Sequence, residues 1–180
     1  ALPGAVAAQD VAGDALQLYG MALKDASAAR FVQAARDAGN RPRGDATAPA
    51  GDGRVGLDAR GAGVPALEEL TVLVHGGKVA AARFRVKGYG EDNASLRRLL
   101  QAKYGVPLTV GARPLPYASF DARLAPRGGF QWRFADGTRL VYEHPRLGDV
   151  TLSYQDDARV EALDRGAASS DDPAAVRNRI

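Results

Sequence analysis

One stretch determines the architecture: Gly129-Phe130-Gln131-Trp132-Arg133-Phe134-Ala135-Asp136-Gly137-Thr138-Arg139-Leu140-Val141-Tyr142-Glu143-His144. Apolar and polar residues alternate through it, and an Asp-Gly dipeptide interrupts the alternation at its centre. This pattern is typical of a β-hairpin that turns one face to a core and the other to water. The remainder of the chain is interpreted as strands and helices assembled around this hairpin.

Working outward, a second hairpin is predicted on either side of Gly76-Gly77, because two glycines both accept positive φ in a two-residue turn. Helical spacing of apolar residues predicts two main helices, which span Lys24–Ala38 and Asn93–Tyr104 and end at Gly39 and Gly105. Asp92 or Asn93 is the expected cap of the second helix. Further strands are predicted at Arg54–Ala59 and Val150–Tyr154, and Leu16–Leu23 is interpreted as a strand or a strand-to-helix junction.

The fold class that follows is α+β, a two-layer sandwich in which an antiparallel sheet carries the two main helices on one face. The order of the elements suggests a pseudo-repeat of helix plus β-meander. The expected domain organisation is a flexible N-terminus over 1–15, a single α+β domain over 16–155 and a polar helix or tail over 156–180. Within the domain, 40–66 is expected to be a long irregular loop around the short strand.

The amino-acid composition excludes several kinds of functional site. The 180 residues include no cysteine, which excludes disulfides, thiol nucleophiles and thiolate metal sites. The sequence contains only two histidines. The formal net charge is +3, but the cations are scattered among acids rather than clustered, so no nucleic-acid partner is expected. No transmembrane segment is expected, because no apolar run approaches the roughly 18 residues needed. The opening Ala-Leu-Pro-Gly looks like a mature N-terminus left by signal-peptide removal, although a trimmed chain fits nearly as well.

Three short sequence motifs resemble those of a group of small uncharacterised secreted proteins of Gram-negative bacteria. They are the Tyr19-Gly20 turn before the first helix, the helix end Lys103-Tyr104-Gly105-Val106-Pro107, and Trp132 followed by Leu152-Ser153-Tyr154. The layout is also loosely similar to helix-plus-four-strand modules of β-lactamase-inhibitor-like and outer-membrane lipoprotein A-like proteins. The resemblance implies a secreted or periplasmic location and an interaction role, and it carries over no catalytic residue. Whether a precursor is lipidated stays open.

Catalytic motifs are missing from the sequence. His75 and His144 each end a predicted strand, and with nearby carboxylates such as Glu143 they would serve a hydrolase or a metal-dependent enzyme if those ends converged. The alternative is that both histidines simply flank loops. No catalytic residue, metal ligand or cofactor is therefore assigned.

Alternation on the strands leads to a different hypothesis. If Phe84 and Val86 face the core, then Arg83, Arg85 and Lys87 face outward in one row, with Arg133 and Ser153 on the same face. Such a basic, hydroxyl-bearing face would suit an acidic protein or an anionic envelope component. We therefore expect a non-catalytic binding module, with the alternative that the polar face is only solvated, as in every half-buried sheet.

Overall fold

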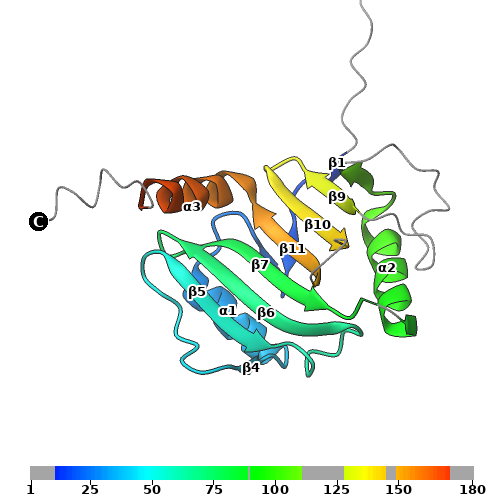
Figure 1. Cartoon of the computed structure of the whole chain (residues 1–180), viewed down its shortest axis with the longest axis horizontal. Helices are drawn as coiled ribbons and strands as arrows, with labels where there is room; N and C mark the ends of the chain where they lie inside the picture. Colours follow the sequence, from blue (N-terminus) through cyan, green and yellow to red (C-terminus); the bar gives the residue numbers. More distant parts are fainter. Residues whose placement is uncertain (1–10, 89, 111–127, 145–148, 171–180) are drawn as a thin grey trace, which may run out of the picture.

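The computed structural model describes residues 11–88, 90–110, 128–144 and 149–170 (Figure 1). Its strands and helices follow one another along the chain, and each keeps one label below. They are β1 (Val11–Gly13), β2 (Gln17–Leu18), β3 (Met21–Ala22), α1 (Ala28–Asp37), β4 (Arg41–Pro42), β5 (Gly53–Asp58), β6 (Leu67–His75), β7 (Lys78–Val86), α2 (Gly90–Tyr104), β8 (Leu108–Val110), β9 (Gly128–Phe134), β10 (Thr138–His144), β11 (Val150–Asp156) and α3 (Asp157–Ser170).

A single large sheet dominates the described part of the chain. Its strand order is β1-β9-β10-β11-β7-β6-β5-β4, and β8 pairs with the same edge of β9 that β1 uses. Every neighbouring pair in this order is antiparallel except β1 and β9, which are parallel, so the sheet is mixed. The antiparallel sheet predicted from the sequence is therefore corrected at this one edge, by a short N-terminal strand.

Both predicted hairpins are confirmed. Gly76 and Gly77 have φ of 56° and 69°, the conformation that a tight two-residue turn between twisted strands needs. In the other hairpin Gly137 has φ of 84°, and the backbone N–H of Thr138 donates to the Asp136 carboxylate at 3.0 Å. The Asp-Gly dipeptide thus makes the turn between β9 and β10 in the way its chemistry suggests.

The core lies on one face of this sheet, which we call the core face. Rows of paired residues run across the strands, and two of these rows are Leu70–Phe84–Leu152–Tyr142–Phe130 and Val72–Ala82–Tyr154–Leu140–Trp132. All ten residues are buried. Figure 1 shows α1 behind β5 and β6, and its Phe31 and Val32 belong to the same apolar cluster.

Helix α2 begins earlier than predicted, at Gly90, so Asn93 is not its cap but a buried residue of its first turn. The Asn93 amide donates to the carbonyl of Lys87 at 2.6 Å and to the Tyr142 hydroxyl at 3.1 Å. Leu96 and Leu100 are buried as predicted, whereas Leu99, also expected in the core, is 53% exposed. Because the helix turns Leu96, Arg97 and Leu100 inward, Leu99 falls on its outer side.

Within the stretch 40–66 the short strand predicted at Arg54–Ala59 is confirmed as β5, whose Val55 and Leu57 are buried, and β4 is a further strand that was not predicted. Two other segments differ from the sequence-based expectation. Residues 16–23 form the separate β2–β3 hairpin instead of one strand. In the region 156–180, expected to be a polar helix or tail, the described residues form helix α3, which runs from Asp157 to Ser170.

The α+β class is confirmed by this combination of one large sheet and helices α1, α2 and α3 in the part of the chain described above. The finer arrangement, two main helices that form one layer of a two-layer sandwich, stays a prediction. So does the pseudo-repeat. The predicted site residues on β7, β9 and β11 now have defined positions in the sheet.

Candidate functional site

The face opposite the core, which we call the outer face, carries most of the predicted site. Arg83 pairs across the strands with Ser153 on one side and Thr71 on the other, and Arg85 pairs with Thr151 and Glu69. Their neighbour Phe84 is buried in the core, so the alternation along β7 places both arginines on the opposite face. Four of the predicted residues, Arg83, Arg85, Arg133 and Ser153, are strand residues of the outer face.

Arg83 is the most accessible cation at the centre of this face. Its side chain is exposed, and its Nε donates to the Ser153 hydroxyl at 3.3 Å. No carboxylate lies within 4.0 Å of Arg83 or Arg133 among the described residues. Ser153 itself is buried, so its hydroxyl holds the guanidinium in place and is not a contact point for a partner.

The predicted basic row continues through Arg85 and Lys87, but acids accompany both. Arg85 Nε lies 3.4 Å from Glu68 and 3.3 Å from Glu69, and Lys87 Nζ lies 3.0 Å from Asp92. Arg43 also pairs with Glu69. The row therefore carries less net positive charge than its sequence predicts, because the acids come from β6 and α2, which the β7 sequence does not reveal.

A polar network on the same face was missed by the sequence analysis. Arg139 donates to the Gln131 side-chain oxygen at 2.9 Å and to the Asp157 carboxylate at 3.1 Å, and Gln155 donates to Asp157 at 2.9 Å. Arg139 also lies directly across from Arg133. The alternation that identified Arg133 continues into β10, so extending it to Arg139 would have found this residue.

The two histidines do not form a joint site. Strands β6 and β10 run in opposite directions, since β7 and β11 lie between them and each neighbouring pair is antiparallel. His75 and His144 end these two strands, so they lie at opposite ends of the sheet, more than about 20 Å apart at 3.3 Å per residue. His75 Nδ1 lies 3.0 Å from the Asp52 carboxylate. The pKa of Asp52 is lowered, chiefly by the hydrogen bond from the Gly76 backbone and also by His75.

No cluster of three or more His, Cys, Asp or Glu side chains suited to a metal ion occurs in the described ranges. The arrangement around each histidine therefore supports neither a hydrolytic pair nor a metal centre built from both. A site with only His75 would use Asp52, which is largely exposed.

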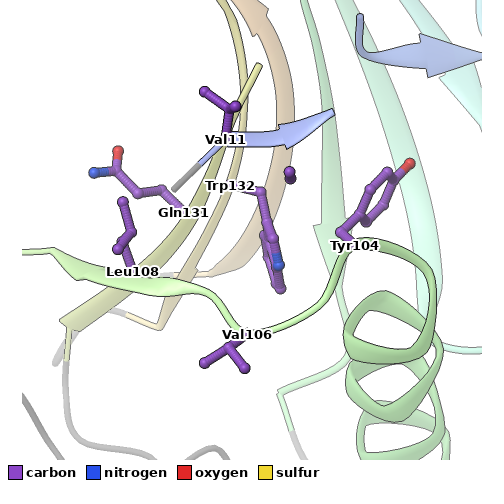
Figure 2. Close-up of a pocket in the computed structure, with 7 residues that line it drawn as sticks. Val11, Tyr104, Val106, Leu108, Gln131 and Trp132 are labelled. Atoms are coloured by element: carbon purple, nitrogen blue, oxygen red, sulfur yellow. The ribbon is translucent and has the colours of Figure 1, made fainter. Parts of the chain in front are cut away.

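A cavity of about 270 Å³ lies at the edge of the sheet where β1 and β8 both flank β9. Figure 2 shows the residues that line it. The cavity is lined by Val11, Ala12, Tyr104, Val106, Leu108, Gln131 and Trp132. The Trp132 indole N–H donates to the Gly105 carbonyl at 3.0 Å, and the Tyr104 hydroxyl points away from the cavity in Figure 2. The lining contains no charged side chain, so this cavity offers shape and apolar contact but no acid–base chemistry.

Comparison of the chain with protein families, with curated proteins and with solved structures finds no match. Of the helices that the structure describes, none has the length and apolar content required to cross a membrane. The site must accordingly be interpreted from its own geometry.

Proposed function

We propose that the protein is a non-catalytic binding module that engages an acidic protein through its outer face, in a secreted or periplasmic location. The proposal takes α1 and α2 as one layer over the core face, which leaves the centre of the outer face available to a partner. The contact residues would be Arg83 and Arg133, with Arg85 at the margin, and Ser153 would orient Arg83. Lys87 contributes least, because Asp92 already neutralises it.

The exposure and the contacts of the Arg83 guanidinium support this proposal most strongly. The Arg83 guanidinium is exposed at the centre of the sheet and donates to the Ser153 hydroxyl, and no acid of the described ranges lies within 4.0 Å of it, so it retains donors for a carboxylate of a partner. Arg133, also without an acid nearby in the described part, lies on the same face. Two such cations form a fixed pattern, since both lie on rigid strands.

The proposed partner is a protein and not a lipid surface or a polysaccharide, because the outer face carries mixed charge. Glu68, Glu69 and Asp157 lie among its arginines. A uniformly anionic surface would be repelled by these acids, whereas a protein can match an alternating pattern with its own cations and acids. A partner whose acids and cations match those of the outer face would bind specifically and in one orientation.

The experiment is a double charge reversal with a matched control. The test variant is R83E/R133E, and the control is R30E/R165E, which makes the same charge change at two exposed helix positions. Immobilised wild-type chain is incubated with envelope extract of a Gram-negative bacterium, and bound acidic proteins are quantified. We expect the test variant to lose bound protein at least about tenfold and the control to retain it, since like charges opposed across an interface cost several kcal/mol. Equal retention by both variants would overturn the proposal.

A further inference from the structure

The large sheet ends in two edges, and the edge at β4 is protected against pairing with a further strand. Strand β4 consists of Arg41–Pro42, and both residues are exposed. Proline has no backbone N–H to donate to a neighbouring strand, and an exposed charged side chain would lose its water if another strand covered it. A short strand with a proline and a charge therefore closes this side of the sheet.

The opposite edge, which we call the β1/β8 edge, carries none of these protective residues. Strands β1 (Val11–Gly13) and β8 (Leu108–Val110) both pair with β9, and neither pairs with a second strand in the described part of the chain. Their sequences contain neither a charged residue nor a proline. A strand that has a neighbour on only one side presents backbone N–H and C=O groups on the other, so this edge can extend the sheet.

Exposed apolar side chains gather at the β1/β8 edge. The large apolar side chains of the described residues that are more than half exposed are Val11 at 54%, Val106 at 60% and Leu99 at 53%. Val11 and Val106 both line the cavity of about 270 Å³ shown in Figure 2, whereas Leu99 lies on α2 outside it. The edge thus combines two exposed valines with a hollow, and an apolar surface of this kind usually marks a contact with another molecule.

We propose that the β1/β8 edge binds the same edge of a second copy of the chain, so that the two sheets join edge to edge around a two-fold axis. In such a contact each residue near the axis faces its own copy, and a charged residue would oppose a like charge. Neither strand of the edge nor the lining of the cavity contains a charged side chain. The edge therefore meets the electrostatic requirement for contact with itself.

The shape of the edge also favours a second copy. Val11 and Val106 belong to the same patch as the hollow that they line, so each copy offers side chains that the hollow of the other can accept (Figure 2). Exposed side chains and a hollow on one patch satisfy each other in a single two-fold contact, which closes at two copies and does not extend into a filament. Neither Arg83 nor Arg133 lines the cavity, so this contact is separate from the binding of an acidic protein to the outer face.

The molar mass of the full chain in solution tests the proposal. We expect sedimentation equilibrium to show a change from one copy to two as the concentration rises from about 5 μM to about 500 μM, a range suited to a contact formed by two short strands. The test variant is V106D, which places a carboxylate in the contact. The control is L99D, which makes the same change at a similarly exposed residue outside the cavity.

We expect V106D to raise the dissociation constant of the dimer at least about tenfold, because like charges then oppose each other across the axis, and L99D to leave it unchanged. Because Val106 and Leu99 are both more than half exposed, both variants should keep the fold, which the circular dichroism spectrum checks. A wild-type chain that stays monomeric over this range, or a V106D dimer as stable as the L99D dimer, would overturn the proposal.

A mixture of V106D and V106K tests the position and the symmetry of the contact. Each variant alone should be monomeric at a concentration at which the wild type is dimeric. The mixture should form a dimer with one copy of each variant, since the opposite charges attract each other across the axis. Formation of this mixed dimer would place position 106 of both copies in the contact. If the mixture stays monomeric, the two-fold contact at Val106 is wrong.

Discussion

At the scale of single residues, the buried side chain of Asn93 has a role that its position in the sequence does not reveal. Asn93 joins α2 to the rest of the core, because its side-chain amide donates to the Lys87 carbonyl and to the Tyr142 hydroxyl. The sequence presents Asn93 as a helix cap, because asparagine before an apolar helical pattern usually has that role. Tertiary burial gives it a different one, which no local pattern reveals.

We predict that N93A lowers the free energy of unfolding by roughly 1–3 kcal/mol, because it removes the hydrogen bonds that the buried Asn93 amide donates to the Lys87 carbonyl and the Tyr142 hydroxyl. Y142F removes the other half of the contact. If the two residues act together, the double variant loses less stability than the sum of the single losses, measured by urea unfolding. Strict additivity would show that the Asn93–Tyr142 hydrogen bond contributes nothing.

The buried tyrosines predict sensitivity to alkali. Burial raises the pKa of Tyr19 to about 12, although the hydrogen bond from Asn40 partly offsets this, and burial also raises the pKa of Tyr154. The folded chain then holds these protons more tightly than the unfolded chain does, so the stability they contribute is complete below a pH of about 10 and is lost as the pH rises further.

Urea unfolding measured from about pH 9 to about pH 12 should therefore show stability that falls with pH. In Y19F the fall should be shallower, since the Asn40 amide keeps its hydrogen bond to the Ala35 carbonyl at 2.7 Å. A Y19F curve as steep as that of the wild type would assign the alkaline loss to other groups.

At the scale of elements, turns were easier to predict than helix faces. Gly76-Gly77 and Asp136-Gly137 identify their hairpins because few residues accept the required positive φ. The face of α2 was harder, since Leu96, Leu99 and Leu100 all fit one helical stripe and only the position of the sheet decides that Leu99 is exposed. The short strand β1 was missed because three residues carry no periodic pattern.

The Gly76-Gly77 turn allows a prediction with a built-in control. In both positions an alanine must adopt positive φ, which costs about 1 kcal/mol or more. At Gly77 an added Cβ would also lie 2.8 Å from the Ala50 carbonyl oxygen, whereas at Gly76 it would meet open space. We expect G77A to have a lower free energy of unfolding than G76A, measured by urea unfolding. Equal losses of stability in the two variants would show that the loop around Ala50 shifts without an energetic penalty.

At the scale of the whole molecule, the two faces of the sheet differ in the side chains that they carry. Its core face holds the apolar cluster, and its outer face presents Arg83 and Arg133 among acids. The sequence predicted which strand residues face outward, because alternation is a local property. It could not predict that Glu68, Glu69 and Asp92 accompany Arg85 and Lys87, because those pairings depend on which elements become neighbours.

Site-directed cross-linking tests the central claim most directly, because the chain has no cysteine and each introduced one is unique. T71C and T151C place a photoreactive label on the outer face beside Arg83 and Arg85, and A29C and Q33C place it on exposed positions of α1. After illumination in envelope extract, the account predicts cross-links to acidic proteins from the two outer-face positions and none from α1. Cross-links from α1 alone would contradict it.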